Sequence, residues 1–241
     1  MRTFYSPPSF SSRQLTIVAI SDTHGMHRQM EIPPGDVLIH SGDLCWDGTL
    51  DEIADFNAYL GTLPHRYKIL VAGNHDLAFA HTPAAARALL TNAIYLEDEA
   101  VILEGLKFYG SPWQPRYDDL AFNLNRGADI QAKWGLIPAD TDVLITHGPP
   151  YGIRDYISET HERVGCQDLL NTVLQMRPRY HIFGHIHDSA GVTIRYGTTF
   201  VNASICDMHY RLAHRPIICK VRLPVPKPVR RPTAPLPALV M

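Results

Sequence analysis

Five short and nearly continuous apolar runs stand out along the chain and predict buried β-strands. They occupy residues 15–20, 36–40, 67–72, 142–146 and 181–183. Apolar residues at successive positions are typical of strands that are covered on both faces. Between the runs, the pattern predicts helices over 51–60, 82–90, 128–134 and 166–176. The second of these helices starts with Thr82 and Pro83, a capping hydroxyl followed by proline in the first turn.

Two further segments predict hairpins, 100–110 around Glu104-Gly105 and 192–202 around Gly197. Strands that alternate with helices, with hairpins added, indicate an α/β fold with mixed sheets. No repeat or internal linker is evident, so we expect one domain over residues 14–221.

The two ends of the chain differ from this pattern. Residues 1–13 are rich in Ser and Pro and predict a loose N-terminal arm. Residues 222–241 contain prolines too often for a helix or a central strand. They predict a Pro-rich tail that is either disordered or extended along the body.

A polar motif follows each of the five apolar runs. In chain order the motifs are Ser21-Asp22-Thr23-His24, Gly42-Asp43, Gly73-Asn74-His75-Asp76, His147-Gly148 and Gly184-His185-Ile186-His187. Open α/β sheets bind ligands in the crevice beyond the carboxyl ends of their strands. Glycine in or near each motif lets the backbone turn sharply and approach a bound group. We therefore expect the five motifs to converge on one site.

The side chains in these motifs suit a pair of divalent cations. Asp22 and His24 are two residues apart on an extended segment and project in the same direction. The carboxylate of Asp43 can bridge two ions. The remaining donors are one amide oxygen and three imidazoles, from Asn74, His147, His185 and His187. Such a mixed set of N and O ligands favours Mn, Fe, Co or Zn over Ca.

Two ions about 3.5–4 Å apart can polarise a phosphoryl oxygen and share a hydroxide that attacks phosphorus in line. Each motif taken alone is equally compatible with a structural or surface role. The ordered set at predicted strand ends is what predicts a shared metal centre.

The series D-x-H, GD, GNHD, H-G and GHxH resembles the calcineurin-like metallophosphoesterases over residues about 20–190. A closer resemblance is to the metallophosphoesterase-domain proteins related to brain protein 239. It rests on Gly110-Ser111-Pro112-Trp113, Phe122-Asn123-Leu124, Thr146-His147-Gly148-Pro149-Pro150, Arg163-Val164-Gly165-Cys166 and Asn202-Ala203-Ser204. The resemblance implies a four-layer α-β-β-α sandwich, in which two mixed β-sheets are flanked by helices.

The resemblance also implies which residues hold each ion. The first site would use Asp22, His24, Asp43 and His187, and the second would use Asp43, Asn74, His147 and His185. His75 would face the phosphate as an acid or charge stabiliser and would not be a ligand. Some animal members lack the first His of GHxH, whereas His185 is present here, so both sites are expected to be intact.

One departure from related enzymes bears on the substrate. The phosphoprotein phosphatases of the superfamily carry a phosphate-binding Arg four residues after the Asp of GD, and this chain has Asp47 there. A carboxylate disfavours a dianionic monoester more than a singly charged diester. This favours a phosphodiesterase. Asp47 could equally cap the next helix or orient His75, and Asp76 could orient His75 or cap a turn.

Four residues near the motifs are candidates for contact with substrate, with packing or surface roles as the alternative: Trp113, Arg126, Tyr151 and Arg154. His40, three residues before Asp43, fits a buried supporting role better than a ligand role.

Composition changes this picture little. Lys and Arg number 22 against 24 Asp and Glu, so no basic excess indicates nucleic acid or an anionic membrane. Four cysteines without a CxxC pair predict reduced thiols and a cytoplasmic protein. The N-terminus lacks a secretory pattern, and no apolar stretch approaches the roughly 18 residues that a membrane span requires.

The sequence thus predicts a phosphoesterase with two transition-metal ions, Mn foremost, acting on a small phosphodiester such as a nucleotide. The alternatives are a phosphomonoesterase, a nuclease and a non-catalytic metal-binding scaffold. A nuclease is disfavoured because no basic and aromatic stripe is present. The pattern specifies neither the natural substrate nor an oligomeric state.

Overall fold

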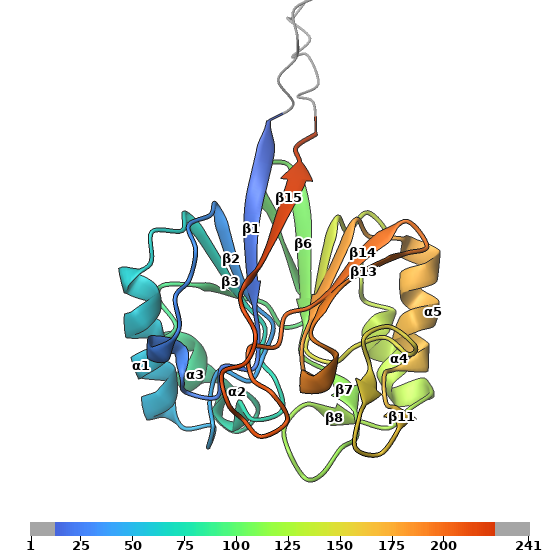
Figure 1. Ribbon diagram of the computed structural model, residues 1–241, viewed down its shortest axis with the longest axis horizontal. Helices are drawn as coiled ribbons and strands as arrows, with labels where there is room; N and C mark the ends of the chain where they lie inside the picture. The colour runs from blue at the N-terminus through green and yellow to red at the C-terminus, as the bar shows by residue number, and fades with distance from the viewer. Residues whose placement is uncertain (1–12, 225–241) are drawn as a thin grey trace, which may run out of the picture.

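Two β-sheets lie face to face in the middle of the computed structural model, which describes residues 13–224 (Figure 1). The predicted arm, apart from Arg13, and the predicted tail, apart from residues 222–224, lie outside the described residues. The first sheet has the order β15-β1-β2-β3-β4. Its strands are β1 (Gln14–Ile20), β2 (Val37–His40), β3 (Tyr67–Leu70), β4 (Ile94–Tyr95) and β15 (Ile217–Arg222).

The second sheet has the order β13-β14-β12-β9-β6-β5. Its strands are β5 (Glu99–Leu103), β6 (Leu106–Ser111), β9 (Val143–Thr146), β12 (Tyr180–Phe183), β13 (Gly191–Arg195) and β14 (Thr198–Asn202). In each sheet the central strands are parallel, and antiparallel strands lie at edges: β15 in the first sheet, β5 and β13 in the second. The two predicted hairpins are β5–β6 and β13–β14.

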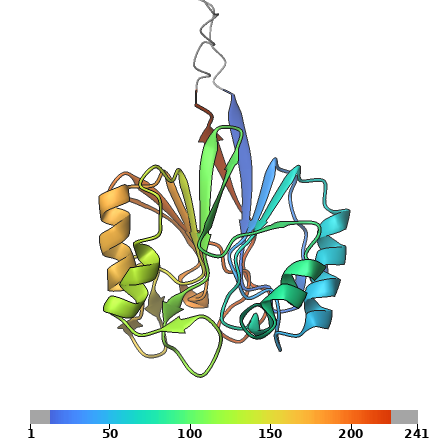
Figure 2. The ribbon, with the colours of Figure 1, turned by 180° about the vertical axis from the view of Figure 1, so that it is seen from behind.

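Helices cover the outer faces of both sheets (Figures 1 and 2). The first sheet carries α1 (Leu50–Thr62), α2 (Leu77–His81) and α3 (Pro83–Leu89). The second carries α4 (Ala128–Trp134) and α5 (Gln167–Met176). The predicted four-layer sandwich is confirmed. No helix within residues 13–224 has the length and apolarity that a membrane crossing requires.

Alternate residues of each strand enter different hydrophobic cores, which explains the continuous apolar runs. In β1, Ile17 faces the core between the two sheets, whereas Val18 faces α1. In β9, Val143 points between the sheets and Leu144 points toward α4 and α5. A strand that is covered on both faces favours apolar side chains at successive positions.

The helix starts show how local sequence sets the element bounds. Thr49 caps α1: its hydroxyl accepts from the N–H of Glu52, whose carboxylate accepts from the N–H of Thr49 in return. Because Thr49 is the cap, Asp47 is not. Cys166 precedes α5 and accepts from Leu169 N–H through its sulfur.

Several short elements complete the fold near the carboxyl ends of the strands. These are the ribbon of β7 (Gln114–Pro115) and β8 (Asn123–Leu124), the ribbon of β10 (Tyr156–Ile157) and β11 (Glu162–Arg163), and the 3₁₀ turns His27–Gln29 and His187–Ser189. From these elements, Gln114, Pro115, Ile157, His187 and Asp188 line the site described next.

Candidate metal centre

The five polar motifs meet at one end of the double sheet. Each follows β1, β2, β3, β9 or β12, and these strands are parallel within their sheets, so their carboxyl ends lie at a common edge. The two edges are joined where Ser21 pairs with Ser204 and Ile205 N–H donates to Ser21 O at 2.9 Å. Convergence of the motifs, as expected from the sequence, is therefore observed.

Asp22, His24 and His187 form a first cluster whose donor atoms lie within 4.8 Å of one another. His187 Nε2 lies 3.3 Å from Asp22 Oδ1 and 3.4 Å from His24 Nε2. Asp22 is fixed from the other side, because Ser204 Oγ donates to Oδ2 at 2.8 Å and the N–H of His185 donates at 3.0 Å.

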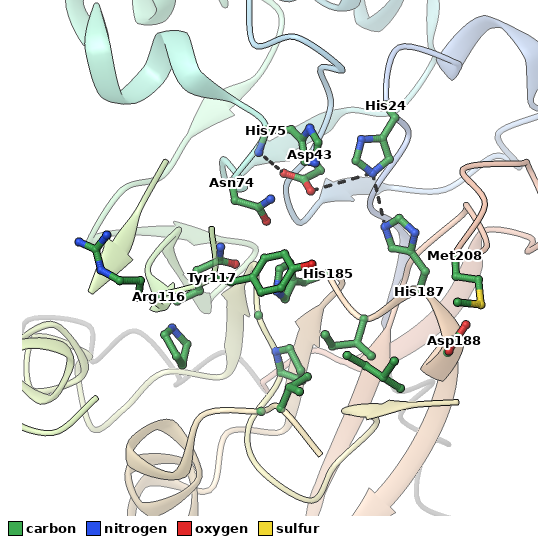
Figure 3. A pocket seen from close by; sticks show the side chains of 18 of the residues that line it. His24, Asp43, Asn74, His75, Arg116, Tyr117, His185, His187, Asp188 and Met208 are labelled. Carbon is green, nitrogen blue, oxygen red and sulfur yellow. Dashed lines mark hydrogen bonds and ion pairs between the residues drawn. The ribbon is translucent and has the colours of Figure 1, made fainter. Parts of the chain in front are cut away.

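Asp43, His147 and His185 form a second cluster of the same kind. His147 Nε2 is 3.4 Å from Asp43 Oδ2 and 2.9 Å from the amide oxygen of Asn74. Asp43 Oδ2 is also 4.0 Å from His24 Nε2, in the first cluster. Asp43 therefore lies between His24 of the first cluster and His147 of the second (Figure 3).

His75 stands beside both clusters and is half-buried. Its backbone N–H donates to Asp43 Oδ1 at 2.8 Å, and its Nδ1 donates to Trp46 O at 3.0 Å. Nε2 is thus the ring atom left to face the cavity. His75 also forms a possible three-donor group with His24 and Asp43. Its orientation is set by Trp46, and not by Asp47 or Asp76.

Two of the clustered histidines are held by carbonyl groups behind them. His147 Nδ1 donates to Ser41 O at 2.9 Å, and His187 Nδ1 donates to Asp207 O at 2.9 Å. A hydrogen bond at Nδ1 fixes the tautomer and leaves the Nε2 lone pair for a cation. Nδ1 of buried His24 has no hydrogen-bond partner among residues 13–224.

Four residues of the clusters have an unusual backbone conformation. Asp22, His24, Asp43 and His185 adopt positive φ angles of 55°, 42°, 56° and 68°. Residues other than glycine rarely adopt this conformation, which costs about 1–3 kcal/mol each and is often found at functional sites.

Two glycines allow the loops to approach each other. A Cβ on Gly73 would collide with Asp43 and His147, and a Cβ on Gly184 would collide with Asp22 and Ser21. Larger residues at either position would push the donor groups apart.

The side chain of Asp76 links the loop that carries Asp43 to the loop that carries Gly73. Its carboxylate accepts the backbone N–H groups of Asp43 at 2.9 Å, Cys45 at 3.0 Å and Gly73 at 2.7 Å. His40 is likewise buried, and its Nε2 lies 2.9 Å from Thr23 Oγ1. Both residues support the loops from behind.

Charge is balanced inside the centre. Burial acts to raise the pKa of Asp22 and Asp43, but hydrogen bonds and charges of nearby imidazoles outweigh it and hold both pKa values below their usual range. Burial acts to lower the pKa of His147, but Asp43 raises it to about 9, and the hydrogen bond to Asp22 likewise raises the pKa of His187. Burial lowers the pKa of His185 to about 3. The centre thus gathers two carboxylates and several imidazoles, and a dication that binds there can displace the protons of the imidazoles.

A cavity of about 300 Å³ opens over both clusters. Its lining includes five residues for which no sequence motif gave a signal: Gln114, Arg116, Tyr117, Met208 and Tyr210. Tyr117 and Tyr210 come from loops far apart in the chain, and only tertiary packing brings them together. Tyr210 lies with its ring 4.9 Å from that of His24, and Tyr117 lies 6.0 Å from the ring of His185.

Of the four residues considered for substrate contact, only Arg126 lines this cavity. Trp113 packs against Phe122 and donates from Nε1 to Asp98 at 2.9 Å, which fits the packing alternative. Arg154 donates to Thr193 Oγ1 at 2.7 Å. Neither Tyr151 nor Arg154 is among the lining residues, and exposed Asp47 is also outside them.

A double sheet between helices, with Asp, Asn and His donors gathered at the strand ends, defines a metallohydrolase of the phosphoesterase class. The family model for calcineurin-like phosphoesterases matches residues 15–189, and the chain belongs to this family. Human metallophosphoesterase domain-containing protein 1 is 42% identical over 245 residues, which cover 92% of this chain and 73% of the human protein. UPF0046 protein C25E10.12 of Caenorhabditis elegans is 43% identical over 240 residues, covering 90% and 84%.

Solved structures agree in fold. The crystal structure of TT1561 of Thermus thermophilus superposes with a TM-score of 0.54 at 14% identity, covering 88% of this chain and 100% of that one. Another solved chain reaches a TM-score of 0.64 at 15% identity, again over 88% of this chain and 100% of its own. The resemblance inferred from the motifs is confirmed.

Proposed function

We propose that the protein hydrolyses a small phosphodiester with two divalent transition-metal ions, manganese foremost. Asp22, His24 and His187 would hold the first ion, and Asn74, His147 and His185 the second, with Asp43 shared between them. The observation that supports this assignment is the position of Asp43 between two clusters of donors that each lie within 4.8 Å. When bound, the ions supply a Lewis acid for the phosphoryl oxygens and lower the pKa of water.

The protein's own groups then orient the ester and handle the proton. His75 is fixed by the Trp46 carbonyl at Nδ1, so Nε2 is the atom that would donate a proton to the leaving oxygen or stabilise its charge. Deep burial of Asp22 and Asp43 keeps bulk water away from the ligands. Arg126 lines the cavity and adds a positive charge for the anionic phosphate.

A diester is favoured by the shape of the cavity. Lining residues extend to both sides of the clusters, with Arg116 on one side and Met208 and Asp188 on the other (Figure 3). A monoester has one organic group and fills one side, whereas a diester can occupy both. Because Asp47 does not line the cavity, the charge at that position contributes little to this preference.

We place the protein in the cytoplasm. All four cysteines are buried and free, as expected for a reducing compartment. A nucleotide is one small diester that would fit a cavity with tyrosines on its walls, because a planar base can stack on an aromatic ring.

The experiment is hydrolysis of bis(p-nitrophenyl) phosphate and p-nitrophenyl phosphate by protein treated with chelator and then supplied with Mn²⁺. We expect chelation to abolish turnover and Mn²⁺ to restore it, with kcat/KM higher for the diester by about tenfold, a difference of about 1.4 kcal/mol. Full activity in excess chelator would contradict the metal mechanism. A higher kcat/KM for the monoester would make the protein a phosphomonoesterase, and bound metal without turnover would indicate a scaffold.

A further inference from the structure

The side-chain amide of Gln114 is a buried polar group that the described protein leaves unpaired. Gln114 is 1% exposed, and neither Oε1 nor Nε2 has a hydrogen-bond partner within residues 13–224. Buried amides are almost always hydrogen-bonded in native proteins, because an unpaired one destabilises the fold. Gln114 therefore requires an explanation.

The position of Gln114 connects it to the cavity. It lies in β7, where its N–H donates to Phe122 O at 3.0 Å, and it is part of the cavity lining together with Tyr117 and Gly148. A Cβ placed on Gly148 would lie 3.5 Å from the Cβ of Gln114 and 4.0 Å from its Oε1. The amide is thus beside the loop that carries His147, within the wall that a bound ester would touch.

Arg126, another polar residue of the cavity lining, is paired, in contrast to Gln114. Arg126 donates to Gly165 O at 2.9 Å and to Val164 O at 2.8 Å. Its charge suits the phosphate. A neutral amide adds little for an anion but offers one acceptor and two donors in a plane. Such an amide matches a neutral partner with a donor and an acceptor side by side, as Gln and Asn do with base edges.

We propose that Gln114 is a specificity-determining residue that pairs through its amide with a lactam or imide edge, an N–H next to a C=O, on the organic group of the ester. The inference rests on the proposed phosphodiesterase function. Tyr117, which lies three residues after Gln114 and is 57% exposed, offers a face on which the ring bearing that edge can stack.

The test compares three substrates with matched leaving groups. The first is the p-nitrophenyl ester of thymidine 5′-phosphate, which has an imide edge, the second is its N3-methyl analogue, and the third is bis(p-nitrophenyl) phosphate, which has no such edge. Each is assayed with manganese-loaded wild type, with Gln114→Met, which keeps the side-chain length but removes the amide, and with Gln175→Met, a control at an exposed helix position.

In wild type and in the Gln175 control, we expect kcat/KM to be at least about tenfold higher for the thymidine ester than for its methylated analogue. Gln114→Met should remove this discrimination and lower kcat/KM more for the thymidine ester than for bis(p-nitrophenyl) phosphate, while the metal content stays at the wild-type value. The proposal is overturned if wild type does not discriminate, or if Gln114→Met lowers kcat/KM for all three substrates equally. Failure of the phosphodiesterase function itself would appear separately, as no metal-dependent turnover of bis(p-nitrophenyl) phosphate by wild type.

Discussion

The carboxylate of Asp43 contacts three other residues of the site. Its Oδ2 faces His147 in one cluster and His24 in the other, and its Oδ1 accepts the N–H of His75. Its own backbone is held at a positive φ by the N–H bond to Asp76. An amide in place of the carboxylate would lose the charge and one acceptor while the strained loop remained.

Asp43→Asn is therefore expected to weaken both metal sites together. The loss in metal affinity should exceed the roughly 10–100-fold typical of losing a supporting partner behind a ligand. Metal content after gel filtration, measured by atomic emission, and turnover of bis(p-nitrophenyl) phosphate provide the readouts. Asp47→Asn, four residues away and exposed, is the control and should keep both. Retention of one full equivalent of metal by Asp43→Asn would show that the residue serves a single ion.

In the proposed mechanism, His75 acts on the leaving group and does not hold an ion. We expect His75→Ala to lower kcat by roughly 10²–10⁴, the usual contribution of a positioned acid or base, with metal content near wild type. The loss should shrink for substrates with better leaving groups, because these need less protonation. If the variant instead loses its metal, the three-donor group of His24, Asp43 and His75 is a binding site and His75 is a ligand.

At the scale of elements, the conformation of the loop between β7 and β8 is held by hydrogen bonds to one side chain, that of Asn123. The amide of Asn123 donates to Tyr117 O at 3.1 Å, Asp118 O at 2.9 Å and Leu120 O at 3.1 Å, and its oxygen accepts from Tyr117 N–H at 3.2 Å. These bonds hold the segment that carries Tyr117 over the cavity.

Asn123→Ala is expected to raise KM roughly 3–10-fold, because each lost bond of this kind contributes about 0.5–1.5 kcal/mol to the position of the loop. The metal content should not change. Steady-state kinetics on a diester and a thermal melt provide the measurement, and Asn171→Ala on the outer helix α5 is the control. An unchanged KM would mean that Tyr117 does not contact substrate.

The same elements show how far sequence reasoning reaches. The ends of β1, β2, β3, β9 and β12 could be predicted because strand and motif are contiguous in the chain. Helix α2 could not, since its five residues follow the GNHD motif directly and a new helix begins at Pro83. Strand β15 also escaped prediction, although Cys219 and Val221 alternate with exposed positions, because the prolines that follow obscure the pattern.

The rim of the cavity could not be predicted for a different reason. Tyr210 sits in a turn closed by Asp207, whose carboxylate accepts the N–H groups of His209 and Arg211. Nothing local marks that turn as part of a site. Its place over His24 results from the hydrogen bond between the Asp207 carbonyl and His187.

At the scale of the whole molecule, β15 closes the first sheet against β1. Val221 is fully buried in the core between the sheets and pairs with Leu15, whereas Ile218 on the same strand is 51% exposed. The strand therefore presents one face to the core and the other to solvent.

Val221→Ala is expected to lower the free energy of unfolding by about 2 kcal/mol, the scale of burying a side chain of this size. Ile218→Ala should change it by less than about 0.5 kcal/mol, as is usual for surface positions. Equilibrium unfolding in urea measures both. Equal losses in the two variants would show that the packing of β15 differs from that described.

The pairing of β1 with β15 also determines where attached sequences leave the molecule. Leu223 N–H donates to Arg13 O at 2.9 Å, so the two ends of the described chain are neighbours. They lie at the amino end of β1, whereas the cavity lies beyond its carboxyl end (Figure 1). A reporter domain joined directly to residue 13 or residue 224 would therefore project away from the cavity. A circular permutant that links the two ends through a short peptide, with new termini opened in an outer loop, should retain an unobstructed entrance for substrate.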